Sequence, residues 1–145
     1  MKILYVCTGN TCRSPMAQAI TEWMAESRGL NDDVVVDSAG TGCPYGDPMT
    51  ENAAKAVAAR GIFFTHQSKK VTENDLSDSD AVICMTPIHK LALEKFADPS
   101  KLYSANDFIG HEIPDPYGGG EEVYEECARQ LESLAAAVLD RFCGK

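Results

Sequence analysis

A short loop near the amino terminus, Cys7-Thr8-Gly9-Asn10-Thr11-Cys12-Arg13-Ser14, constrains the fold of this sequence more than any other segment. The apolar run Ile3–Val6 precedes it and, being rich in β-branched and aromatic residues, predicts a buried strand. Ser14 and Pro15 then follow the pattern of a helix N-cap and a proline at the first helical position. A strand, a tight loop and a helix N-terminus can together direct backbone N–H groups at one anion. The sequence therefore predicts a phosphate-binding loop directly after the first strand.

Two side chains give this loop the means to react. Cys7 begins the loop, where the positive field of a helix N-terminus favours thiolate over thiol. Arg13 closes it with a planar guanidinium that can bind two oxygens of a phosphate. We therefore expect the loop to hold a tetrahedral oxyanion directly over a sulfur nucleophile.

Strands and helices alternate along the rest of the chain. After a first helix from Pro15 to about Gly29, the predicted elements are a strand over Val34–Val36, a helix capped by Asp47 that ends near Gly61, a short helix with a capping box at Thr72 and Asp75, a strand over Ala81–Met85, a helix from Pro87 to Phe96, a weak strand over Lys101–Tyr103 and a final helix over 123–138. This order predicts an α/β fold with a parallel sheet covered by helices on both faces. At 145 residues, we expect one domain spanning 1–145.

Apolar residues at helical spacing mark the predicted core of the two longest helices. They are Met16, Ile20, Trp23 and Met24 in the first helix and Val123, Cys127, Leu131, Leu134 and Val138 in the last. For Trp23 we therefore favour core packing over a role in binding. Cys84 lies in an apolar strand and is expected, like Cys127, to be a small core residue.

Charge and composition exclude several classes of protein. The formal net charge of −9 argues against nucleic acid or an anionic membrane as a partner. Met1 and Lys2 lead directly into the first strand, and no apolar run is long enough to span a bilayer, so we expect a cytoplasmic protein without a signal peptide. In a reducing compartment most of the six cysteines should be free thiols.

The loop and a downstream motif together resemble the low-molecular-weight protein-tyrosine phosphatase family. The shared features are Cys-x5-Arg-Ser after the first strand, with Asn10 and Cys12 inside the loop, and Asp115-Pro116-Tyr117 far downstream. The resemblance covers nearly the whole chain. It implies a four-stranded parallel sheet, a phosphate-binding loop made of Thr8, Gly9, Asn10, Thr11, Cys12, Arg13 and Ser14, phosphorylated proteins as substrates, and no metal or cofactor.

The same resemblance assigns the catalytic roles. It implies that Cys7 attacks phosphorus, Arg13 binds the phosphoryl oxygens, Ser14 steadies the thiolate and Asp115 protonates the leaving group. For Asp115 the alternative is an ordinary solvated turn, since Asp-Pro followed by glycines is common in loops. The chemistry needs an acid, however, and the flanking prolines hold this carboxylate stiffly on a loop.

Thr11 bears on the substrate. Within the family, threonine at this position is typical of the protein-arginine-phosphatase branch, whereas tyrosine phosphatases usually carry a larger aliphatic residue. A hydroxyl-bearing side chain in place of a bulky aliphatic one suits a polar, branched guanidinium better than an aromatic ring. In addition, Gly118 follows Tyr117 at the position where some tyrosine-directed members of the family carry a second aromatic residue. We therefore expect hydrolysis of phosphoarginine, with phosphotyrosine hydrolysis by the same mechanism as the alternative.

Two further tyrosines are candidate specificity residues. Tyr45 lies in the glycine- and proline-rich segment 41–46 at the end of a predicted strand, where open α/β sheets bind ligands. We expect this segment to form one wall of the pocket, with simple loop packing as the alternative for Tyr45. Tyr117, beside the predicted acid, is the second candidate.

Other readings of the same residues stay open. Cys12 either packs in the core or forms a reversible disulfide with Cys7 that protects the nucleophile from irreversible oxidation. Arsenate reduction is a remote alternative, because it needs a further cysteine pair downstream, and a phosphate-binding module without catalysis is another. His66, His89 and His111 are scattered and are expected at the surface or at helix caps, with His89 at the outer edge of the pocket.

Overall fold

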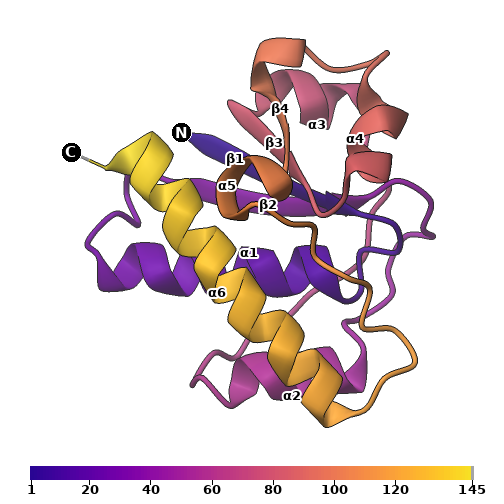
Figure 1. Cartoon of the computed structure of the whole chain (residues 1–145), viewed down its shortest axis with the longest axis vertical. Coiled ribbons are helices and arrows are strands. Elements are labelled where there is room, and N and C mark those ends of the chain that lie inside the picture. Colours follow the sequence, from indigo (N-terminus) through magenta and orange to yellow (C-terminus); the bar gives the residue numbers. More distant parts are fainter. Residues whose placement is uncertain (145) are drawn as a thin grey trace.

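A four-stranded parallel sheet forms the centre of the protein. The computed structural model describes residues 1–144, and the strands lie in the order β2-β1-β3-β4. Their bounds are Lys2–Cys7 for β1, Val35–Gly40 for β2, Ala81–Cys84 for β3 and Leu102–Ser104 for β4. The predicted fold class is confirmed, and the loop after β1 leaves the sheet between its two neighbouring strands (Figure 1).

Helices cover both faces of the sheet, as predicted. The bounds are Arg13–Ser27 for α1, Glu51–Ala58 for α2, Glu73–Asp78 for α3, Pro87–Leu93 for α4, Asn106–Ile109 for α5 and Glu121–Cys143 for α6, with a 3₁₀ turn at Pro99–Lys101. Helices α1 and α6 pack on one face with α2 outside them, and α3 and α4 cover the other (Figure 1). Within residues 1–144, no helix has both the length and the apolar composition required to cross a membrane.

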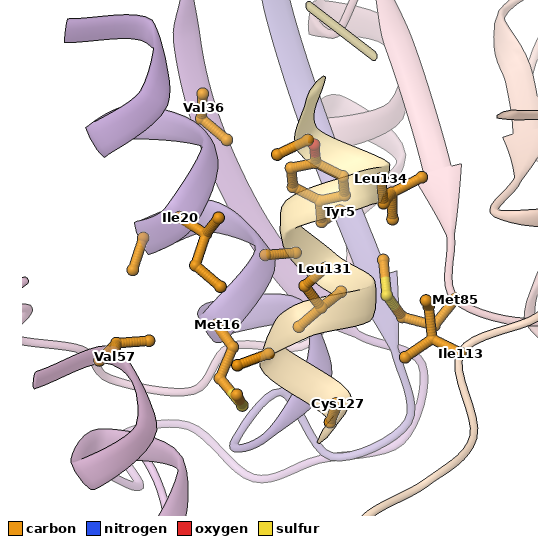
Figure 2. Close-up of a cluster of buried hydrophobic side chains, with 14 of the residues drawn as sticks. Tyr5, Met16, Ile20, Val36, Val57, Met85, Ile113, Cys127, Leu131 and Leu134 are labelled. Atoms are coloured by element: carbon orange, nitrogen blue, oxygen red, sulfur yellow. The ribbon is translucent and has the colours of Figure 1, made fainter. Parts of the chain in front are cut away.

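The core consists of two clusters separated by the sheet. Alternate residues of β1 point to opposite faces, so Ile3 and Tyr5 join the α1/α6 cluster while Leu4 and Val6 join the α3/α4 cluster. In the larger cluster Tyr5 lies beside Leu134 of α6 (Figure 2). The Tyr5 hydroxyl is satisfied by the Thr21 hydroxyl at 2.7 Å, and burial raises the Tyr5 pKa.

Two predicted N-caps are wrong and one capping box is right. Helix α1 begins at Arg13 rather than after Ser14, because the Ser14 hydroxyl is used inside the loop. Helix α2 is capped by Thr50 instead of Asp47, whose backbone N–H and carbonyl both pair with Ser68. The capping box of Thr72 and Asp75 is present with both of its hydrogen bonds.

Helical spacing misplaced one residue in each long helix. Trp23 is 39% exposed, because the inward face of α1 turns through Ala17, Thr21 and Ala25. At the start of α6 it is Tyr124, rather than Val123, that is buried. The other predicted core positions of α6, together with Cys84, are buried as expected.

Several element boundaries also differ from the predicted ones, among them the ends of α6, which runs from Glu121 to Cys143. Strand β2 continues to Gly40, because residues 38–40 pair with Tyr5, Val6 and Cys7. Helix α4 ends at Leu93, one turn before the predicted end at Phe96. Strand β4 starts one residue later than predicted, after the 3₁₀ turn.

Truncating Leu131 should strongly destabilise the protein. Its side chain is fully buried between α6 and the sheet (Figure 2), so Leu131→Ala should lower the free energy of unfolding by about 2–5 kcal/mol. Val123→Ala on the same helix, at a half-exposed position, is the control and should change it by about 0.5 kcal/mol or less. Urea denaturation measures both, and equal losses would contradict this account of the core.

Candidate active site

The Cys7 thiol lies at the bottom of the loop that follows β1. It is 2% exposed, and its Sγ is 2.8 Å from the Ser14 hydroxyl oxygen. Ser14 also accepts a hydrogen bond from the Asn10 side-chain amide at 2.9 Å, which leaves its own proton to donate. The sulfur at 2.8 Å is a closer acceptor than the Ala39 carbonyl at 3.5 Å. Ser14 can therefore donate a hydrogen bond to the sulfur.

Asn10 holds the loop in its curved shape. Its φ of 53° lies in the left-handed region, which asparagine adopts more readily than most residues. Its buried side chain donates to Ser14 and to Ser38, and accepts from the backbone N–H of Lys69 at 3.0 Å. The backbone carbonyl oxygen of Asn10 is 2.7 Å from Nε2 of His66. The loop is thus fastened to β2 and to the segment 66–69.

The loop also offers the backbone N–H groups of residues 8–12. Within the described chain none of them donates to another protein group, so they can donate to a bound anion. The loop also packs closely on β2, where a Cβ on Gly40 would lie 2.5 Å from the Thr8 carbonyl oxygen. Only glycine permits this approach.

Arg13 connects the loop to the segment before α6. The guanidinium is almost fully buried, donates to the Ile113 carbonyl oxygen at 3.1 Å and lies 3.7 Å from the Asp115 carboxylate. Ile113 is itself tied to β3, because its N–H donates to the Met85 carbonyl oxygen. The structure therefore brings Asp115 to the loop, as the sequence predicted, although it is 102 positions away from Arg13 in the sequence.

A cavity of about 220 Å³ lies between the loop and Asp115. Its lining residues are Cys7, Thr8, Gly9, Asn10, Thr11, Cys12, Arg13, Asp115 and Tyr117. The segment 41–46 is outside this lining, so the expected wall comes from Tyr117 instead. Tyr45 is exposed, and its hydroxyl donates to the side-chain oxygen of Gln67.

The Cys12 thiol contacts two helices that pack against the loop. Its Sγ is 3.3 Å from the Tyr124 hydroxyl of α6 and 3.6 Å from the Thr50 hydroxyl at the start of α2. Burial raises the pKa of Tyr124 to about 12. Cys12 is buried and, like Cys7, is a free thiol.

Two histidines brace the loop, a role that the sequence does not predict. His89 lies in the first turn of α4, next to its cap as expected, but it is outside the lining of the cavity. His66 is half-buried against Asn10, and burial lowers its pKa. His89 is buried, and its Nε2 is 2.7 Å from the Thr8 hydroxyl. Neither contact has a signal in the sequence, because each joins residues more than 50 positions apart without a periodic pattern.

Comparisons with known proteins agree with this geometry. The family model described as low molecular weight phosphotyrosine protein phosphatase matches residues 2–143. A protein-arginine-phosphatase of Bacillus subtilis is 36% identical over 139 residues, covering 92% of this chain and 91% of the relative. A low molecular weight protein-tyrosine-phosphatase of Streptomyces coelicolor is 34% identical over 152 residues, covering 95% and 91%.

The fold comparison reaches the same family. The solved arginine phosphatase of Geobacillus stearothermophilus matches with a TM-score of 0.87 and 33% identity, over 98% of this chain and 92% of that one. The matched region of the family model runs from the first strand to the last helix. The chain therefore belongs to the low molecular weight phosphotyrosine protein phosphatase family and is a hydrolase of that family.

Proposed function

We propose that this phosphatase hydrolyses phosphoarginine in protein substrates through a phosphocysteine intermediate. The observation that carries the proposal is the lining of the cavity, where Thr11 places a small hydroxyl-bearing side chain and Tyr117 is the one aromatic residue. Gly118 has a φ of 84°, a conformation that strains any other side chain, so a second aromatic is disfavoured there. A guanidinium can hydrogen-bond to a threonine, whereas a phenyl ring gains more from aliphatic contact.

In the first step the Cys7 thiolate attacks phosphorus in line with the leaving nitrogen. The S–P bond forms as the P–N bond breaks, and Asp115 gives its proton to the departing guanidine nitrogen. Arg13 and the loop amides stabilise the charge on the equatorial oxygens. The products of this step are free arginine in the substrate protein and phosphocysteine.

In the second step Asp115, now a carboxylate, takes a proton from water. The water oxygen attacks phosphorus, the S–P bond breaks and the electron pair returns to Cys7. Ser14, at 2.8 Å from the sulfur, stabilises this leaving thiolate. Inorganic phosphate is released and the enzyme is restored.

Phosphotyrosine hydrolysis by the same steps is the second candidate. Tyr117 favours it, because its ring is exposed at the cavity and offers a surface for an aromatic side chain. Both reactions need an acid, since phenols have a pKa of about 10 and guanidines one above ~12. The need to protonate the leaving group therefore does not distinguish phosphoarginine from phosphotyrosine. The side chain at position 11 can be changed to test which substrate is preferred.

Enlarging Thr11 should move the specificity toward tyrosine. Thr11→Ile replaces the hydroxyl with aliphatic bulk, so kcat/KM on a phosphoarginine peptide should fall relative to a phosphotyrosine peptide by about tenfold or more. Thr65→Ile, at an exposed position, is the matched control and should leave the ratio unchanged. A ratio unaffected by Thr11→Ile would overturn the proposed preference for phosphoarginine.

Replacing the acid Asp115 should slow the hydrolysis of substrates with poor leaving groups most. Asp115→Asn should lower kcat on phosphoarginine about 10²–10⁴-fold, and much less on an aryl phosphate whose leaving group departs without a proton. Glu112→Gln, in the same segment and exposed, should leave both rates intact. Equal losses on the two substrates would contradict the acid role.

We also propose that Cys12 protects Cys7 from irreversible oxidation. Peroxide oxidises the Cys7 thiolate to a sulfenic acid, and the Cys12 thiol then displaces water to form a disulfide. Inactivation by dilute peroxide should therefore be reversed by a thiol reductant. In Cys12→Ser the Cys7 sulfenic acid has no partner thiol, so longer exposure should oxidise it to a sulfinic acid and the reductant should recover progressively less activity. Peptide mapping of the oxidised protein should find the Cys7–Cys12 crosslink; its absence would rule out this role.

A further inference from the structure

The Thr8 side of the phosphate loop has its own tertiary anchor. Asn10 fastens the far side of the loop to β2 and to residues 66–69, but these contacts do not reach the residue after Cys7. The side-chain contact there joins the Thr8 hydroxyl to Nε2 of His89 at 2.7 Å, across 81 positions of sequence. The contact is shorter than an average nitrogen–oxygen hydrogen bond.

His89 is rigidly held from its other side. It lies in the first turn of α4, and its Nδ1 is 3.0 Å from the hydroxyl of Thr86, the N-cap of that helix. The same hydroxyl oxygen accepts the backbone N–H of His89 at 3.3 Å. Since Thr86 follows β3, which pairs with β1, the ring is fixed to the sheet that carries Cys7.

The ring is neutral and fully engaged at neutral pH. Burial and the nearby positive charge of Arg13 lower the pKa of His89 to about 4. A neutral imidazole has one donor and one acceptor nitrogen, so in either tautomer one threonine accepts from the ring and the other donates to it. With both nitrogens occupied, 6% of the residue exposed and the cavity lined by other residues, His89 has no free site for a substrate proton.

We propose that His89 is a positioning residue, which fixes Thr8 and thereby holds the first amides of the phosphate loop in their anion-binding orientation. The β2 side of this stretch is held by backbone hydrogen bonds, because the carbonyl oxygens of Cys7 and Thr8 accept the N–H groups of Thr41 and Gly42 at 2.9 and 3.1 Å. His89 holds the same stretch from the β3 side, through the exposed Thr8 side chain. The amides of Thr8 and Gly9 donate to no protein acceptor in the described chain. Their direction at the anion therefore depends on both holds, the backbone bonds on the β2 side and the His89 contact on the β3 side.

A double-mutant cycle tests this role. Thr8→Val and His89→Ala should each lower kcat/KM for an aryl phosphate by about tenfold and weaken competitive inhibition by inorganic phosphate by a similar factor. Because the two residues act through one hydrogen bond, the double variant should lose about tenfold and not about a hundredfold. Thr8→Val replaces an exposed residue, so it reports on the contact even if His89→Ala folds poorly.

Two further variants distinguish positioning from general stability. His89→Gln has an amide that can donate or accept at the same place, so activity should return to within about threefold of the parent enzyme. His111→Ala, at an exposed position, is the control and should change nothing. Multiplicative losses in the double variant, unchanged phosphate inhibition, or a glutamine variant no better than alanine would each overturn the proposal. These probes carry no amino acid, so the result is independent of the arginine or tyrosine preference.

Discussion

The left-handed backbone of Asn10 is the constraint on which the site depends. An eight-residue loop can turn its amides inward and return Ser14 to within 2.8 Å of Cys7 only if the chain reverses sharply between them. Asparagine tolerates this conformation, and its side chain at the same time satisfies Ser14, Ser38 and the Lys69 backbone. One residue therefore supplies both the curvature of the loop and its attachment to the rest of the fold.

The sheet order explains why distant segments meet at this loop. Strand β1 is central, so the chain leaving it is flanked by the ends of β2 and β3. Strand β2 contributes the close approach of Gly40, and the chain after β3 contributes the cap and first turn of α4, with His89. Parallel sheets bind ligands at the carboxyl ends of their strands for this reason: several connections converge there on one point.

The sequence predicted the elements whose pattern is local. The sheet, the phosphate loop and the α6 core follow from apolar periodicity and one compact motif, and Asp115 follows from its family resemblance. The local pattern predicts a helix cap at Ser14 and the family resemblance predicts a partner for the Cys7 sulfur, because a serine hydroxyl serves either a backbone amide or a thiol. Only the fold shows which partner is near. His66 and His89 were missed because tertiary contacts leave no periodic trace. The four residues of α5 are too few to show a period.

The two halves of the cavity differ in their access to water. The sulfur and the guanidinium are buried, whereas the Asp115 side chain is 57% exposed and Tyr117 is 75% exposed at the rim. In the proposed mechanism, a bound substrate would itself displace solvent from this carboxylate during the first step. Once the dephosphorylated chain departs, bulk water would reach the same carboxylate for the second step. The substrate would then set the solvent access of each proposed half-reaction by binding and leaving.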